Sequence, residues 1–364
     1  MIFNKYKKNT FKNVFKIKQL FNFIKLLKKM KKTTIVDISK ATGFAKSTVS
    51  KALNNSNEIS KKTKKKINSF AKKFNYQPNF FARNLRKRNL KNVGIIIPDI
   101  LNYYFAKVIK GAQKEFFNNG YDLVCFFNEE STSKEKKILE KLKNGSVSGL
   151  LISLAKNPYS ENIKKTLKDF KSLNTPIVMF DRVLDDFKCD KVLIDDFNST
   201  FDSVKHLVSA GKRKIAFVSP IHDTIIGRKR YDGYVDGLKS ENIKFDKDLY
   251  IPLTKGDTIE SEITKLSSND RIDAIICIEQ NTTISILSLL LNLGYKVPKD
   301  IAIIGFTDGP IFKYVKPSIT SIDQHGEYVG KLSAKLLIKR IENDQNEDFT
   351  DEMIPTSLIK RNST

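Results

Sequence analysis

Residues 34–53 read TIVDISKATGFAKSTVSKAL, and this stretch decides how the first part of the chain folds. Thr34 with Asp37 three residues later is typical of a helix start, because the threonine can cap the first turn and an acid is favoured at that end of a helix. Gly43 interrupts the helical pattern, and a second short helix is expected from about 45 to 53. Two short helices joined by a glycine-containing turn predict a helix-turn-helix.

A third helix is expected directly after this pair, from about residue 61 to 74 and behind Ser60. Apolar residues recur along it at helical spacing. They are Ile67, Phe70, Ala71 and Phe74. Packed against the apolar sides of the first two helices, this stripe would close a three-helix core.

The polar residues of the second helix face away from its apolar side. They are Lys46, Ser47, Ser50 and Lys51. The major groove of DNA admits an α-helix, where a lysine can donate to guanine and a serine can bond bases or phosphates. These side chains are therefore candidates for reading DNA, and the alternative is that they form an ordinary solvated helix surface.

The charge of the chain is concentrated at the same end. Residues 1–91 hold 26 Lys and Arg against two acids, whereas residues 92–364 hold 39 basic against 38 acidic side chains. Nearly all of the net charge of +25 therefore lies in the first quarter. Such a distribution is typical of a head that binds a polyanion, either nucleic acid or an anionic membrane surface. A solvated basic tail is the alternative.

The first 29 residues contain nine Lys and no acid. A signal peptide needs an unbroken apolar run of about 7–15 residues, and Lys25 interrupts the run Leu20–Leu27. We expect Met30 to be the initiator, so that residues 1–29 are upstream sequence or a disordered extension. A basic amphipathic helix on a membrane surface is the alternative.

The rest of the chain alternates between strand-like and helical stretches. Apolar segments of strand length occur at 93–98, 123–127, 149–153, 177–181, 214–219, 273–278 and 301–306. With helical segments of roughly 12–15 residues between them, they predict parallel sheets covered by helices on both faces. Two sets of such units predict two lobes. We expect the first lobe at about 92–190 and 321–348, and the second at about 191–320 and 349–364.

The sequence offers little support for an enzyme, a cofactor or a metal. Cys125, Cys189 and Cys277 are too isolated for a disulfide framework or a zinc site, and they point to a reducing cytoplasm. No glycine fingerprint for a nucleotide follows a strand, and the three histidines form no recognisable catalytic set. No apolar run approaches the roughly 18 residues of a membrane helix.

Polar residues follow several of the expected strands, where open parallel sheets bind ligands. They are Asp99, Asn102, Asp181, Arg182, Asp195, Asp196, Glu279, Gln280, Asn281 and Asp308. We expect a ligand at these strand ends.

The chain from Met30 onward resembles the lactose-repressor (LacI/GalR) family of transcription regulators. In the head, the matching residues are 34–39, Gly43-Phe44, 47–54, Ile59-Ser60, Thr63, Asn75-Tyr76, Pro78-Asn79, Ala82 and Leu85. In the rest of the chain they are 93–99, 181–182, 211–216, 228–234, 297–301, 305–306 and 317–320. The resemblance implies an α+β multidomain protein. A three-helix head and a hinge helix would precede a two-lobed α/β core similar to periplasmic sugar-binding proteins.

For the head, the resemblance implies a DNA-binding domain at 30–78 and a hinge helix with its linker at 79–91. Its DNA-binding residues would be Thr34, Lys46, Ser47, Thr48, Ser50, Lys51, Asn54, Asn79, Ala82 and Leu85. Thr34, Thr48 and Asn54 would position the backbone, and Leu85 would wedge into the minor groove. Two residues depart from the pattern. Ala45 replaces the usual Ser, and Lys51 replaces the more common Arg, whose planar fork a lysine lacks.

For the core at 92–364, the resemblance places Arg230 first among residues that contact a small effector. The full set of effector candidates is Asp99, Asn102, Asp181, Asp196, Arg230, Glu279 and Asp308. Glu279-Gln280 stands where the family usually has Asn-Asp, and Thr307 stands where it usually has Asp. The effector therefore cannot be transferred from the family, although a sugar or sugar derivative is expected.

These features together favour a homodimeric, sequence-specific DNA-binding regulator with a small-molecule sensor and no enzymatic activity, and we expect it to act as a repressor. A dimer is favoured over a tetramer because no heptad pattern follows the final strand-like segment. A periplasmic-type ligand-binding protein without DNA function is the first alternative. An α/β enzyme is the second.

Overall fold

The computed structural model describes residues 33–53, 55–74, 76, 91–156, 161–173, 175–254, 259–268, 271–342 and 348–364. Within it, the chain divides into two compact units, Met1–Arg88 and Asn89–Thr364. The expected N-terminal extension lies outside the described residues, as do four of the expected DNA contacts. These four are Asn54, Asn79, Ala82 and Leu85.

The first unit contains the three expected helices: α2 (Ile35–Thr42), α3 (Lys46–Leu53) and α4 (Lys61–Lys73). Each contributes to one apolar core, which consists of Ile38, Val49, Ala52, Ile67 and Ala71. The three-helix prediction is confirmed. Of the expected stripe on α4, Phe74 is largely exposed because it lies at the C-cap, beyond the turn that packs on the core.

The ends of α2 follow from its sequence. The Thr34 side chain accepts from the Asp37 amide, and the Asp37 carboxylate accepts in return from the Thr34 amide at 2.9 Å, which forms a capping box. At the other end Gly43 has φ +76°, a left-handed conformation that favours glycine and turns the chain toward α3.

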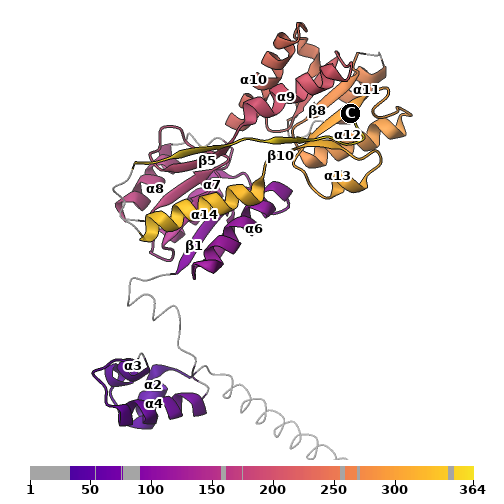
Figure 1. Ribbon diagram of the computed structural model, residues 1–364. Helices are drawn as coiled ribbons and strands as arrows, with labels where there is room; N and C mark the ends of the chain where they lie inside the picture. The colour runs from indigo at the N-terminus through magenta and orange to yellow at the C-terminus, as the bar shows by residue number, and fades with distance from the viewer. Residues whose placement is uncertain are drawn as a thin grey trace, which may run out of the picture. The chain divides into compact units, whose positions relative to one another are not determined.

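The second unit has two lobes, each built on a six-stranded sheet (Figure 1). The first sheet is parallel throughout and has the order β11-β5-β4-β3-β1-β2. Its strands are β1 (Asn92–Ile97), β2 (Asp122–Phe127), β3 (Gly149–Ile152), β4 (Ile177–Phe180), β5 (Asp190–Ile194) and β11 (Asp351–Ile354). Helices α6 (Tyr103–Asn118) and α14 (Gly326–Glu342) pack on one face, and α7 (Thr132–Leu142) and α8 (Glu161–Ser172) pack on the other.

The second sheet has the order β12-β10-β9-β8-β6-β7 and is parallel except for β12. Its strands are β6 (Ile215–Ser219), β7 (Tyr250–Pro252), β8 (Ala274–Cys277), β9 (Ala302–Phe306), β10 (Thr320–Asp323) and β12 (Ser357–Ile359). Helices α9 (Asp196–Ser209) and α10 (Ile225–Ser240) cover one face, and α11 (Ile259–Ser268) and α12 (Gln280–Asn292) cover the other. The short helices η1 (Lys247–Leu249) and α13 (Ile311–Tyr314) complete the lobe.

The chain crosses between the lobes three times, after β5, after β10 and after β11. These crossings fall a few residues later than the boundaries expected at 190, 320 and 348. The expected boundaries need correction because β5 and β11 pair with each other inside the first sheet, whereas β10 pairs with β9 in the second. Strand pairing, which sequence periodicity does not reveal, therefore assigns 191–194 and 349–354 to the first lobe and 321–323 to the second.

Helices α6 and α14 lie side by side on the first sheet because both have a glycine where they meet (Figure 1). A Cβ atom on Gly111 would lie 1.9 Å from the carbonyl oxygen of Glu327, and one on Gly330 would lie 1.9 Å from that of Val108. The absence of a side chain at these two positions therefore sets the close distance between the two helices.

Candidate functional sites in the head and the core

In the head, the outer face of α3 carries three of the residues expected to contact DNA. Lys46, Ser47 and Lys51 are exposed, whereas Val49 and Ala52 of the same helix are buried in the core. Thr48 and Ser50 are half-buried. The structure thus gives α3 one buried and one solvent-facing side, as the sequence pattern predicts, and the contacts of these residues with DNA stay a prediction.

The Lys51 ammonium forms an ion pair with Glu58. Glu58 is one of the two acids among the first 91 residues, and it lies in the turn between α3 and α4. Both side chains are about half exposed, so water screens the pair and its free energy is small, of the order of 0–1 kcal/mol. Another anion can therefore compete with Glu58 for this lysine.

Thr34 forms hydrogen bonds with the first turn of its own helix, α2. Its amide and its hydroxyl both donate to the Asp37 carboxylate, at 2.9 and 2.7 Å. The residue thus fixes where α2 begins.

In the core, the facing ends of the two lobes hold a buried polar cluster. Asp181 follows β4 of the first lobe, has φ +59° and is only 4% exposed. Its carboxylate accepts from the Ser153 hydroxyl at 3.2 Å and lies 3.9 Å from Arg182 Nε. Burial raises the pKa of Asp181 to about 6, although Arg182 and Arg230 oppose the shift.

Asp196 and Arg230 form the part of the cluster that belongs to the second lobe. Arg230 Nε donates to Asp196 Oδ1 at 2.7 Å, and Arg230 Nη1 donates to the Ile278 carbonyl at 3.2 Å. The guanidinium carbon also lies 4.2 Å from the centre of the Phe306 ring. Burial raises the pKa of Asp196 even though Arg230 lowers it. The arginine expected to bind effector is thus buried and held in a fixed orientation.

Tyr104 of α6 connects the two halves of the cluster. Its side chain is buried, and burial raises the pKa of its hydroxyl well above the usual value. The carboxylate of Asp181 in the first lobe and that of Asp196 in the second raise the pKa of this hydroxyl further.

Several buried polar atoms near strand ends have no hydrogen-bond partner among the described residues. They are Tyr104 Oη, Arg182 Nε, Ser219 Oγ, His222 Nδ1 and Gln280 Oε1. Buried polar groups are normally paired, and leaving one unpaired costs roughly 1–3 kcal/mol. These atoms follow β4, β6 and β8 or lie at the start of α6, which is the end of each sheet where parallel α/β folds bind ligands.

Four of the expected effector residues, unlike the unpaired atoms above, already form hydrogen bonds or ion pairs with other groups of the chain. Asp99 accepts from the Leu101 amide at 2.9 Å, and Asn102 caps α6 by accepting from the Tyr104 amide at 3.0 Å. Glu279 caps α12 through the amides of Asn281 and Thr282. Asp308 accepts from the Ser321 hydroxyl and pairs with Arg361. Their role in binding an effector stays a prediction.

Tyr104 and Ser219 are not among the site residues expected from the sequence, and His222 is one of the three histidines that form no recognisable catalytic set. The strand-end rule would have found Ser219, because it is the last residue of β6. Tyr104 carries no such signal, because only the packing of α6 against the sheet buries its hydroxyl.

Direct contacts join the lobes near this cluster. Lys156, which follows β3, lies 3.3 Å from Asp223 Oδ1 and donates to the Pro220 carbonyl at 3.4 Å. Lys107 of α6 lies 3.6 Å from Asp323 at the end of β10. These ion pairs depend on the relative position of the lobes, so they would change if the lobes moved.

Across the described ranges, no helix is both long and apolar enough to span a bilayer. The same residues contain no group of three or more His, Cys, Asp or Glu placed to hold a metal ion.

Two family profiles match the chain. The profile of "Bacterial regulatory proteins, lacI family" matches residues 34–79, and the profile of a "Periplasmic binding protein-like domain" matches residues 204–364. The first profile covers the helix-turn-helix. The second covers most of the second lobe, together with α14 and β11 of the first lobe.

Curated relatives align over nearly the whole chain. An HTH-type transcriptional repressor PurR of Mannheimia succiniciproducens is 27% identical over 330 residues, covering 90% of this chain and 98% of the relative. A ribose operon repressor of Halalkalibacterium halodurans is also 27% identical, covering 91% and 97%.

Solved structures share the fold. The Lac repressor dimer bound to operator and the anti-inducer ONPF superposes with a TM-score of 0.76 at 20% identity, covering 92% of this chain and 99% of that one. A complex of the transcriptional regulator CelR with cellobiose gives 0.66 at 22% identity, covering 92% and 100%.

Proposed function

This chain belongs to the LacI family of bacterial regulatory proteins, and we propose that it is a homodimeric repressor whose affinity for operator DNA depends on a small polyhydroxylated molecule. The family consists of DNA-binding transcription regulators rather than enzymes. We assign residues 30–78 to DNA binding, 79–91 to a hinge helix and linker, and 92–364 to the effector-binding core.

The buried polar cluster between the lobes carries the proposal. Sugar hydroxyls both donate and accept hydrogen bonds, and the cluster offers partners of each kind. Asp181 accepts, Arg182 Nε donates, and the hydroxyls of Tyr104 and Ser219 can do either. The names of two similar proteins, a ribose operon repressor and a regulator in complex with cellobiose, support a sugar or sugar derivative.

A ligand held by both lobes would control DNA binding through their relative position. Closing the lobes on a ligand would alter contacts such as Lys156–Asp223 and thereby the arrangement of the two heads of a dimer. Effector and DNA affinities are then reciprocally coupled. The same coupling permits an inducer or a corepressor, depending on which lobe arrangement fits the operator.

We propose a homodimer because helix-turn-helix proteins read two-fold sites as two-fold dimers. The operator would then be a pseudo-palindrome of roughly 14–20 base pairs. A similar Lac repressor structure is described as a dimer bound to operator. Because the operator DNA of a bacterium lies in the cytoplasm, we propose that the protein acts there. The helix-turn-helix head disfavours the alternative of a periplasmic-type binding protein without DNA function.

Calorimetry with a panel of sugars and nucleosides tests the effector site. We expect Tyr104→Phe, which removes only the buried hydroxyl, and Arg230→Ala to weaken binding of the best ligand about tenfold or more. Arg228→Ala, an exposed position two residues earlier on α10, is the matched control and should bind normally. A ligand that binds wild type and both cluster variants equally would place the effector elsewhere, and gel shifts with that ligand would then decide whether it acts on DNA binding.

A further inference from the structure

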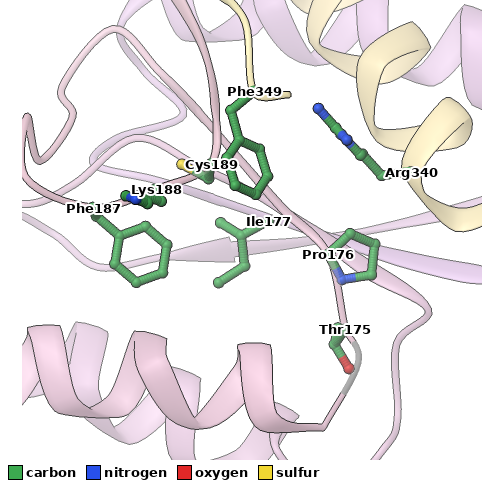
Figure 2. A pocket seen from close by; sticks show the side chains of 8 residues that line it. All are labelled: Thr175, Pro176, Ile177, Phe187, Lys188, Cys189, Arg340 and Phe349. Atoms are coloured by element: carbon green, nitrogen blue, oxygen red, sulfur yellow. The ribbon is translucent and has the colours of Figure 1, made fainter. Parts of the chain in front are cut away.

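The first lobe contains a pocket that the proposed function does not use. Figure 2 shows its lining, which comes from the loops before β4 and β5, the end of α14 and the segment before β11. The lining residues are Thr175, Pro176, Ile177, Phe187, Lys188, Cys189, Arg340 and Phe349. Its volume is about 170 Å³.

This pocket lies at the opposite end of the sheet from the effector cluster. Ile177 is the first residue of β4, whereas Asp181 follows the last residue of the same strand. Four residues of extended chain span roughly 13 Å. A molecule in the pocket would therefore not touch the Asp181 carboxylate.

The interior of the pocket is apolar and has the size of one aromatic ring. Ile177, Phe187 and Cys189 are buried, and the Phe349 ring faces them from the other side (Figure 2). A cavity of about 150 Å³ lined by aliphatic and aromatic side chains is large enough to hold benzene. The pocket is thus suited to a single planar ring.

Two cations border the pocket, and their charges are not equivalent. The charge of Arg340 is already paired, because its guanidinium donates to both carboxylate oxygens of Asp190 at 2.7 and 2.8 Å and to the Asp348 carbonyl at 2.8 Å. Its guanidinium also lies 4.8 Å from the centre of the Phe349 ring. The Lys188 ammonium is exposed and pairs with no acid in the described part of the chain. Among the residues that the structure describes, Lys188 is therefore the cation of the rim that has no acidic partner.

We propose that this pocket is a second ligand site, distinct from the effector site, and that it binds a small aromatic carboxylate. The ring would lie among Ile177, Phe187 and Phe349, and the carboxylate would face Lys188 at the rim. Such a ligand would bridge the β4–β5 side of the first lobe and the segment that leads into β11.

Fluorescence provides a direct test, because the chain contains no tryptophan. Phe349→Trp places a single reporter at the pocket, and Tyr314→Trp places one on an exposed side chain of the second lobe as a matched control. Titration of the full-length protein with benzoate should give a saturable change with the first reporter and none with the second. Acetate, which has the charge without the ring, should give no change with either.

Calorimetry on proteins without the reporter separates the contributions of ring and charge. Benzyl alcohol, which lacks the charge, should bind wild type roughly three- to fivefold more weakly than benzoate, the size of one exposed ion pair. Lys188→Gln should weaken benzoate binding by the same factor and leave benzyl alcohol unchanged. Cys189→Phe should fill the pocket and abolish both.

The proposal is overturned if benzoate gives no saturable signal in wild type, or if Lys188→Gln leaves benzoate binding unchanged. The Lys188 comparison stands even if Cys189→Phe fails to fold, since Lys188 is on the surface. Because the probe is benzoate rather than a sugar, failure here leaves the proposed effector site unaffected.

Discussion

At the scale of single residues, Asp181 and Glu135 are buried carboxyls whose ionised form destabilises the folded core. Burial raises the pKa of Asp181 to about 6 and that of Glu135 to about 7. Glu135 has no cation to pair with among the described residues. Its Oε1 accepts from Asn128 Nδ2 and from the Ala155 amide, both at 2.9 Å, and its Oε2 has no partner there.

These two groups predict a dependence of stability on pH. A carboxyl whose pKa is raised on folding is easier to bury protonated, so stability falls as the pH rises from the unfolded pKa of about 4 through the folded value. We expect Asp181→Asn to remove the loss of unfolding free energy that occurs between about pH 4 and 6. We expect Glu135→Gln to remove the loss that continues up to about pH 7.

Denaturant unfolding of the core across this pH range measures the effect. Each variant should gain of the order of 2–3 kcal/mol relative to wild type at neutral pH and much less at pH 4. Asp190 serves as the contrast, because Arg340 and the Thr350 amide hold its pKa below the usual value despite burial. An unchanged difference between wild type and variant at all pH values would show that these groups do not titrate as inferred.

A second prediction at this scale concerns the Lys51–Glu58 ion pair in the head. Glu58→Gln frees the ammonium for DNA, so we expect operator affinity to rise about two- to fivefold at low salt. Lys51→Ala should lower it, and Lys73→Ala at the end of α4 is the control for a general loss of charge. Gel shifts in which Glu58→Gln binds no better than wild type would mean that Glu58 does not compete for Lys51.

At the scale of elements, the paired glycines of α6 and α14 set how closely two helices lie on the first sheet. Gly330→Ala would place a methyl group 1.9 Å from the Val108 carbonyl oxygen, and backbone cannot move aside as a flexible side chain can. We expect a destabilisation of about 1–3 kcal/mol or more.

Thermal unfolding of Gly330→Ala against Lys331→Ala tests this contact. Lys331 is the exposed neighbour on the same helix, so its substitution should leave the transition nearly unchanged. Because α14 lies between the β10 and β11 crossings, loosening it should also alter effector binding. Wild-type stability in Gly330→Ala would show that the helices separate without cost.

At the scale of the whole molecule, charge is divided between two units with different tasks. The segment 30–91 carries 17 basic and two acidic residues, while residues 92–364 carry 39 basic and 38 acidic residues and are nearly neutral. DNA affinity should therefore fall steeply with salt, by at least about tenfold between 50 and 200 mM, because bound counterions are released from phosphates.

Effector binding measured by calorimetry at the same salt concentrations is the internal control. It should change little, because a neutral sugar meets a buried cluster whose charges are largely paired. If operator affinity is independent of salt in this range, the basic head does not bind through phosphates.

The sequence by itself determined the local elements. The Thr34–Asp37 capping box, Gly43 and the stripe on α4 specify the head, since capping and helical periodicity act over a few neighbouring residues. The seven expected apolar segments all form strands. Six of them are buried, as continuous apolar runs predict, whereas β2 lies at the edge of its sheet and is partly exposed. Two strands that the sequence pattern does not predict, β5 and β11, contain charged residues. They form through pairing in the sheet, where β5 lies between β4 and β11 and β11 is the edge strand.

Only the tertiary structure decided which polar residues share a site. Asp181, Asp196 and Arg230 were expected from strand ends and from resemblance, and the fold brings them near one another. Glu279 and Asp308 carry the same local signal but cap a helix or pair with Arg361, because side-chain partners depend on contacts between distant segments. Tyr104 and the pocket around Cys189 have no local signal, since burial and cavities arise from packing rather than from sequence neighbours.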